Sequence, residues 1–389
     1  MLFRTCLIAA LAFVMLPVAV AAPDKSDASA TPDKSDASAA PAEEFTKLYR
    51  EFKEMVARLT QIQQKYANDP NVDKKALEQE YDSKVEQTKA MEVKVAAAAE
   101  KAYLADPNKE KDQSEFLFAR LSKLVGNDDS EEASRLAKIL VDHGFEHKFF
   151  EAVAGIAFFN DNDFENAEKH LKKAAAAGDL DTGVPVAALA KRAQGLIEKF
   201  NMKESWENEQ KLRENADKHQ HLPRVKLNTT KGDITVELFE DQAPIATNNF
   251  VNLVEKKFYD GLKFQRVIPN FMAQAGDPKG DNSGGPGYTI PDECFQDNHR
   301  NHFRGSLSMA HSSQRDSAGS QFFICFQPLP NLDGQYTVFG RVVEGFDVLA
   351  KLQRCQPGDV NTPDKILKAT VRAKRNHKYE PSIKLPDKK

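Results

Sequence analysis

An arginine lies within an apolar run in the second half of the chain. The segment Phe264–Asp277 (FQRVIPNFMAQAGD) holds Arg266 among large apolar residues, and Gln274 follows the pair Phe271 and Met272. A guanidinium among apolar side chains is costly unless it has a partner or a task. The alternatives are therefore a structural ion pair, and a site where the fixed charge and planar donors of arginine act on a ligand.

Two further segments follow this one along the chain. Ser317–Phe326 reads SAGSQFFICF, and Asn331–Arg341 reads NLDGQYTVFGR. In this order and spacing, the three segments together resemble the cyclophilin family of peptidyl-prolyl cis/trans isomerases. The resemblance extends from about Val225 to about Ala373, well under half of the chain. It implies an isomerase without a cofactor or a metal, whose ligands are proline-containing peptides and unfolded protein clients.

The resemblance also implies which residues form the site. Arg266 and Gln274 match the family's catalytic positions, and Gln274 would bond the substrate backbone or steady the arginine. The substrate-binding positions match Phe271, Met272, Ala310, His311, Ser312, Gln321, Phe323, Leu332 and Tyr336. Without the motifs, the apolar members of this set would be read as ordinary core. Asn331 stands where cyclosporin-sensitive relatives carry tryptophan, which puts tight cyclosporin binding in doubt.

The chemistry that the resemblance implies needs no nucleophile. Rotation about the bond before proline breaks amide resonance, against a barrier of roughly 18–20 kcal/mol. Arg266 can bond the prolyl carbonyl and turn a donor toward the proline nitrogen, whose lone pair appears only as resonance is lost. A charge-assisted hydrogen bond of this kind contributes about 1.5–3 kcal/mol, or roughly ten- to a hundredfold in rate. The remainder must come from an apolar pocket that excludes water.

The elements that must position these residues are expected in a domain over 223–375. After Pro223 the apolar residues alternate with polar ones, and Thr230–Asp233 forms a turn, so the domain begins with a β-hairpin. Pro244 suits the first turn of a helix, and a second helix is expected near Phe346–Leu352. Many short strands with two helices indicate a closed barrel. The resemblance implies eight antiparallel strands, with a helix closing each end.

The residues 43–222 are expected to form an all-α domain of helical hairpins. Apolar residues recur three and four positions apart, and breaks at Asp69–Asn71 and Asp106–Asn108 delimit two long amphipathic helices. Within the shorter helices, Glu151–Gly178 has the small and large positions of a tetratricopeptide-type hairpin. An ordinary helical bundle is the alternative. This domain is a candidate binding surface for a protein partner.

The first residues of the sequence indicate export. Arg4 precedes an apolar core over Leu7–Val20, so residues 1–21 are predicted to be a signal peptide. That apolar run is too short to span about 30 Å of hydrocarbon. Residues 22–42 contain PDKSDASA twice and are predicted to be a disordered low-complexity spacer, and 376–389 a flexible tail. We expect an exported protein, periplasmic or extracellular, with no membrane span after cleavage.

Composition restricts the partners. The 389 residues carry a net charge of −4, and neither part of the chain is basic enough to predict nucleic-acid binding. Three cysteines follow the signal peptide, namely Cys294, Cys325 and Cys355. An odd number in an exported protein permits at most one internal disulfide, and the apolar neighbours of Cys325 favour a buried free thiol.

Two functions remain in competition. The first is an isomerase that assists the folding of exported proteins. The second is a non-catalytic chaperone or scaffold, in which the helical domain binds partners and the barrel only holds proline peptides. The combination of Arg266, Phe271 and Gln274 favours the first, because holding a peptide does not require a guanidinium directed at its amide. A third option combines the two, as a chaperone whose turnover matters little in vivo.

Overall fold

The structure is a computed structural model that describes residues 39–107, 111–219 and 222–383. The expected signal peptide, and the expected spacer up to residue 38, lie outside the described residues. Among the helices that are described, none has the length and apolar character needed to cross a bilayer.

The described chain divides into two compact units. The first runs as far as Lys123 and includes Ile139–Phe145. The second comprises Leu124–Lys138 and the chain from Glu146 onward. The domain boundary expected at residue 222 therefore lies inside the second unit. This unit contains the whole β-sheet together with several helices.

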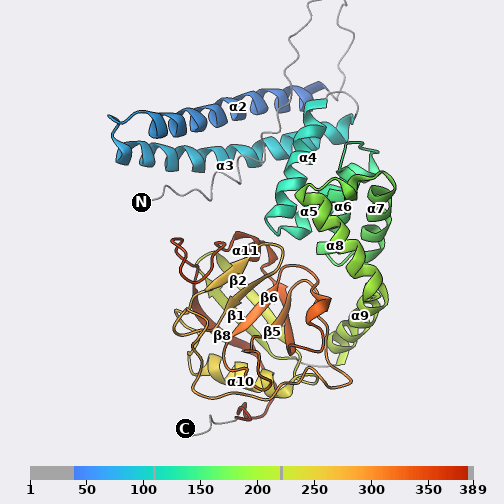
Figure 1. Ribbon diagram of the computed structural model, residues 1–389, viewed down its shortest axis with the longest axis vertical. Helices are drawn as coiled ribbons and strands as arrows, with labels where there is room; N and C mark the ends of the chain where they lie inside the picture. The colour runs from blue at the N-terminus through green and yellow to red at the C-terminus, as the bar shows by residue number, and fades with distance from the viewer. Residues whose placement is uncertain (1–38, 108–110, 220–221, 384–389) are drawn as a thin grey trace, which may run out of the picture. The chain divides into compact units, whose positions relative to one another are not determined.

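The first unit is built on a long helical hairpin. Helices α2 (Ala39–Asn68) and α3 (Lys74–Ala105) lie side by side (Figure 1), so the predicted pair of long helices is present. Asp73 begins α3 by accepting a hydrogen bond from the backbone N–H of Ala76 at 3.0 Å, as an N-cap should. The apolar residues that join the two helices near their connection are Leu59, Ile62, Leu77, Tyr81 and Val85.

Shorter helices follow, as predicted. Helices α4 (Lys111–Gly126) and α5 (Ser130–Asp142) contribute residues to both units. The second unit continues with α6 (Phe150–Asn160), α7 (Phe164–Ala176), α8 (Pro185–Lys199) and α9 (Met202–His219).

Helices α6 and α7 form the hairpin predicted over Glu151–Gly178. They approach closely because Gly155 has no side chain: a Cβ there would lie 2.7 Å from Leu171 Cγ. Asp163 caps the start of α7 by accepting from the N–H of Asn166 at 3.2 Å. One hairpin does not establish a repeat, so the tetratricopeptide-like character of the region is not confirmed.

Eight strands of the described chain form one antiparallel sheet, which curls around an apolar core. Its first strands arise from the alternation seen in the sequence, with Val225 and Leu227 fully buried. The strands are β1 (Arg224–Thr229), β2 (Gly232–Leu238), β3 (Arg266–Ile268), β4 (Met272–Ala275), β5 (Ser306–Met309), β6 (Phe322–Cys325), β7 (Val338–Glu344) and β8 (Ile366–Ala373). Their order in the sheet is β3-β4-β6-β5-β7-β2-β1-β8.

The barrel is not closed, contrary to expectation. Strands β3 and β8 end the sheet, and among the described residues no ladder joins them. Isolated bridges lie at this gap, one between Lys263 and Lys365 and one between Val267 and Cys355. Because β3 is only three residues long and Val267 already pairs with Cys355, it leaves no free edge for β8.

Two helices accompany the sheet, as predicted. They are α10 (Pro244–Glu255), which has proline in its first turn, and α11 (Phe346–Lys351). Phe250 of α10 enters the core, where its ring lies 5.3 Å from that of Phe322. Beyond the sheet, the tail expected to be flexible is held at Tyr379, which is buried and donates a hydrogen bond to Glu240 at 3.0 Å.

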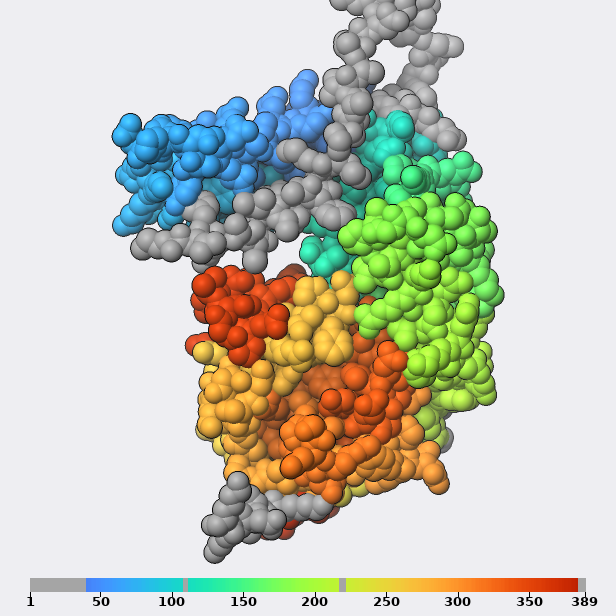
Figure 2. Space-filling model, in the orientation of Figure 1, coloured from blue at the N-terminus to red at the C-terminus, as the bar shows by residue number. Residues whose placement is uncertain are grey.

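Within the second unit, helices of the region α6 to α9 contact the segment that precedes β5. In Figure 2 the green surface of these helices is continuous with the orange surface of the barrel. Trp206 of α9 lies 4.9 Å from the ring of Phe303. Beside them, the buried Arg300 donates two hydrogen bonds of 2.7 Å to the carboxylate of Glu209. The region from α6 onward is therefore fixed to the barrel by apolar and charged contacts.

Candidate active site

The hairpin of β3 and β4 carries both residues predicted to be catalytic. Arg266 and Gln274 are directly opposite in the antiparallel register, so their side chains leave the same face of the sheet. Asn270, in the turn between the strands, has a left-handed backbone with φ 53°, which asparagine tolerates better than most residues. Phe271 follows it directly.

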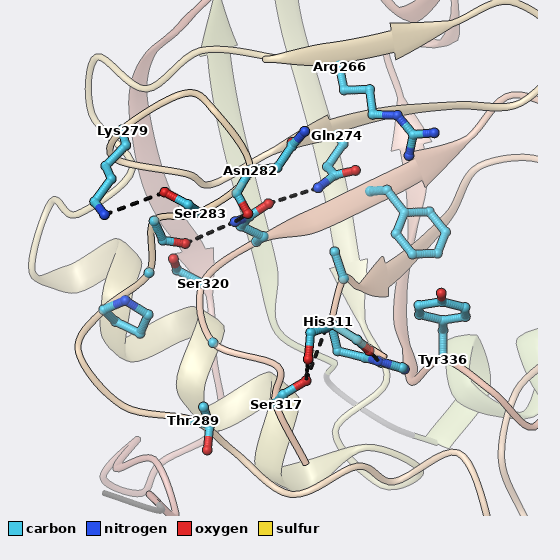
Figure 3. A pocket seen from close by; sticks show the side chains of 18 of the residues that line it. Arg266, Gln274, Lys279, Asn282, Ser283, Thr289, His311, Ser317, Ser320 and Tyr336 are labelled. Carbon is cyan, nitrogen blue, oxygen red and sulfur yellow. Dashed lines mark hydrogen bonds between the residues drawn. The ribbon is translucent and has the colours of Figure 1, made fainter. Parts of the chain in front are cut away.

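A cavity of about 760 Å³ opens over this hairpin, and all eleven residues predicted from the sequence line it. Figure 3 shows Arg266 and Gln274 on one side of the cavity, with His311 and Tyr336 on the other. Strands β3, β4 and β6, the residues directly before β4 and β6, the segment after β5 and the segment before β7 supply these residues. Segments far apart in the chain therefore meet at the predicted site.

One end of the cavity is apolar. Met272 and Phe323 belong to a small buried cluster against which Phe271, Leu332 and Tyr336 pack. The ring of Phe323 meets that of Tyr336 edge-on at 5.7 Å. These interlocked rings give a stiff wall of the size and apolar character that a proline ring requires.

The other part of the cavity is polar and tied together by amides. Gln274 Nε2 donates to Gln321 Oε1 at 2.8 Å. Gln321 Nε2 in turn donates to the carbonyl of Gly284 at 2.9 Å and to that of Asn282 at 3.1 Å. Gln321 therefore links the β3–β4 hairpin to the glycine-rich loop. The bond from Gln274 Nε2 leaves its Oε1 available as an acceptor.

Arg266 faces the cavity without a carboxylate partner. Within the described ranges, its guanidinium makes no ion pair, and its Cζ lies 5.9 Å from the centre of the Phe271 ring. The alternative that Arg266 is a structural ion-pair residue thus finds no support. A free guanidinium beside an apolar wall can donate hydrogen bonds to a ligand held there.

A family model described as cyclophilin type peptidyl-prolyl cis-trans isomerase matches residues 224–371. A peptidyl-prolyl cis-trans isomerase of Helicobacter pylori is 50% identical over 136 residues, which are 34% of this chain and 80% of that protein. The chain belongs to this family. Peptidyl-prolyl cis-trans isomerase B of Bacillus subtilis is 46% identical over 127 residues, or 33% of this chain and 85% of that protein. The cyclophilin domain of the chain is thus a peptidyl-prolyl cis-trans isomerase.

Solved structures resemble the same part of the chain. A cyclophilin of Cryptosporidium parvum is 32% identical with a TM-score of 0.36, and the match covers 40% of this chain and 99% of that one. The same protein in the presence of the dipeptide ala-pro is 33% identical, with a TM-score of 0.35, and the match covers 39% of this chain and 99% of that one.

The cyclophilin domain also contains a buried layer behind the cavity that sequence reasoning missed. The ring of His302 lies parallel to that of Phe323, with centres 5.9 Å apart. Its Nδ1 is 2.8 Å from Asp333 Oδ1, and its Nε2 is 3.0 Å from Ser308 Oγ. His302 therefore packs behind Phe323, on the apolar wall of the cavity. No motif in the sequence includes this histidine, so no local signal could have indicated its role.

The glycine-rich loop is the second part of the site that was not predicted. The cavity is also lined by residues from Lys279 to Thr289. Glycine is required close by, because a Cβ at Gly276 would lie 2.3 Å from the carbonyl oxygen of Ser320. In the sequence this segment is marked only by its density of glycine, which does not by itself indicate a ligand site.

The cysteines take no part in the cavity. Cys294, Cys325 and Cys355 are buried free thiols. Burial raises the pKa of Cys325 well above its usual value, so this thiol stays protonated and unreactive.

Proposed function

We propose that the cyclophilin domain assists the folding of exported proteins, and that Arg266 promotes rotation of the bond before proline. In this mechanism the apolar wall takes the proline ring. Arg266 bonds the prolyl carbonyl and offers a donor to the ring nitrogen as its lone pair emerges. Gln274 Oε1 accepts from the substrate backbone. No covalent bond forms or breaks, so these groups need only stabilise the twisted amide more than the planar one.

One observation carries this proposal: Arg266 is a guanidinium without a carboxylate in the described residues, and it borders a cavity with an aromatic wall. A structural arginine would be paired. A purely passive peptide holder would have no use for an unpaired charge at this point. The non-catalytic scaffold is therefore the weaker hypothesis.

Isomerisation of a short proline peptide tests the role of Arg266. We expect Arg266→Ala to lower kcat/KM by about ten- to a hundredfold, because it removes a charge-assisted bond made in the transition state. Arg266→Lys keeps the charge without the planar fork and should recover only part of the loss. A folded Arg266→Ala protein that is as active as the parent would disprove the mechanism.

Export is the other half of the proposal and rests on the pattern of residues 1–21. Fractionation of cells that express the full chain should find it outside the cytoplasm and shortened at its start. Deletion of residues 2–21 should retain it inside. Equal distribution of both forms would contradict export.

A further inference from the structure

A buried carboxylate of the helical region contacts the β3–β4 hairpin. Asp128 lies in the short connection between α4 and α5, far outside the residues that the family model matches. Its side chain is fully buried. One oxygen, Oδ1, accepts a hydrogen bond of 2.8 Å from the backbone N–H of Asn270, the turn residue of the β3–β4 hairpin. Both residues belong to the second compact unit.

The other oxygen of Asp128 holds a second segment of the barrel. Oδ2 accepts from Arg354 Nη2 at 2.7 Å, and the same nitrogen donates to the carbonyl of Asn127 at 2.7 Å. The next residue, Cys355, exchanges two backbone hydrogen bonds with Val267 of β3, of 2.8 and 3.1 Å. The carboxylate therefore closes a ring of contacts that joins the turn of the hairpin to the segment paired with its first strand.

The hairpin fixed in this way determines the geometry of the site. Arg266 precedes Asn270 by four residues, and Phe271 follows it directly, so movement of the turn changes the distance between guanidinium and apolar wall. Asn270 also lines a small hollow with Asn160 and Leu196 of the helices, which places it between the two parts of the unit.

We propose that Asp128 is a positioning residue for the isomerase site, acting through Asn270 and Arg354 on the hairpin that carries Arg266 and Phe271. A residue of the helical region thereby sets the catalytic efficiency of the cyclophilin domain. The inference rests on the proposed role of Arg266. A displacement of about 1 Å in a catalytic group can lower the rate as much as a hundredfold.

Asp128→Asn is the informative variant. Asp128 has a left-handed backbone with φ 61°, which asparagine and glycine adopt readily and alanine does not. The amide can accept one of the two hydrogen bonds but loses the charge that faces Arg354. We expect kcat/KM on a short proline peptide to fall about tenfold, and Asp128→Gly to lose more, with peptide binding reduced less than turnover.

Asp161 provides a matched control. It too is an acidic turn residue of the helices that bonds a barrel arginine, Arg304, at 2.8 Å, but it does not touch the hairpin. Asp161→Asn should keep kcat/KM within about twofold of the parent, since its contact lies away from the catalytic groups. An equal loss in both variants, or parental activity in a folded Asp128→Asn protein, would overturn the proposal.

The pH profile separates positioning from a loss of stability. Burial, opposed by the charge of Arg354 and the hydrogen bond from Asn270, raises the pKa of Asp128 to about 6. Arg354 is the charged group that faces it. Acidification through pH 6 should therefore lower kcat/KM in the parent and in Asp161→Asn, and Asp128→Asn should lack this component. Only the part of the pH dependence that Asp128→Asn removes is assigned to Asp128. The same profile in all three proteins would refute the inference.

Two further measurements complete the test. If Asp128→Asn does not fold, the parent is followed as the pH is lowered. The rate of amide hydrogen exchange at Asn270 should then rise, and kcat/KM should fall, with the same midpoint pH. Different midpoints would count against the inference. The variant Arg266→Ala distinguishes the two proposals. If that variant is fully active, the mechanism fails; if it is inactive while Asp128→Asn equals the parent, only the positioning role fails.

Discussion

Gln274 shows how an amide leaves Arg266 without an ion pair across the β3–β4 hairpin. It lies opposite Arg266 across two strands, where a carboxylate would form an ion pair with the guanidinium. The amide avoids this and instead donates to Gln321 at 2.8 Å. At this position the neutrality of the side chain matters as much as its hydrogen bonds.

The variant Gln274→Glu should therefore withdraw Arg266 from the substrate. We expect a loss of kcat/KM of the same order as for Arg266→Ala, about tenfold or more, with partial recovery at high salt, which screens the new pair. Gln321→Glu is the control, since it also adds a carboxylate to the cavity but keeps an oxygen that accepts from Gln274 and does not lie opposite Arg266. The idea is wrong if Gln321→Glu is as damaging as Gln274→Glu.

At the scale of elements, the close contact between α6 and α7 depends on a glycine, which has no side chain. A Cβ at Gly155 would lie 2.7 Å from Leu171 Cγ, whereas a Cβ at Gly195, in α8, meets nothing within 4 Å. Both residues are in helix interiors, so their intrinsic helix propensities are alike and only the packing differs.

Alanine substitutions at the two glycines should have opposite effects. Gly155→Ala should lower the free energy of unfolding by about 1–3 kcal/mol, because the helices are forced apart. Gly195→Ala should raise it by about 0.5–1 kcal/mol through helix propensity. Urea denaturation followed by circular dichroism measures both. If Gly155→Ala stabilised the protein, the two helices would be able to move apart at little cost, contrary to this expectation.

The elements also show what a sequence can predict. The eleven cavity residues were predicted because they lie in local motifs, and the paired helices because apolar spacing is local. The contacts of Asp128 with Asn270, and of Glu209 with Arg300, join residues far apart in the chain and have no local pattern. Closure of the barrel was predicted wrongly, because a count of short strands does not reveal that no ladder joins β3 to β8 in the described residues.

At the scale of the whole molecule, a buried charge cluster holds α9 to the barrel. Glu209 is almost completely buried and bonds both Arg300 and Arg213 at 2.7 Å. Burial acts to raise its pKa, but the hydrogen bonds and charges of Arg300 and Arg213 outweigh burial and lower it below the usual value. A carboxylate with a lowered pKa stabilises the fold above its unfolded pKa, and that contribution is lost as the pH falls through the folded one.

Glu209→Gln should therefore be destabilising in a pH-dependent way. At pH 7 the free energy of unfolding should fall by about 3–5 kcal/mol, because Arg300 remains buried without its counter-charge. The difference between variant and parent should shrink on acidification below about pH 4, as the parental carboxylate takes up a proton. Urea titrations of both proteins at several pH values give this difference. A difference in unfolding free energy that stays constant with pH would contradict this explanation by charge.

The contact between Trp206 and Phe303 has a practical consequence for dissecting the chain. A fragment cut to begin at Arg224 would keep Phe303, which is 1% exposed in the intact molecule, but would lack the helices that cover it. Two guanidiniums, those of Arg300 and Arg304, would lose their acidic partners at the same surface. Such a fragment would expose a surface that is both apolar and positively charged. Its poor solubility would result from the truncation and would not be a property of the cyclophilin domain.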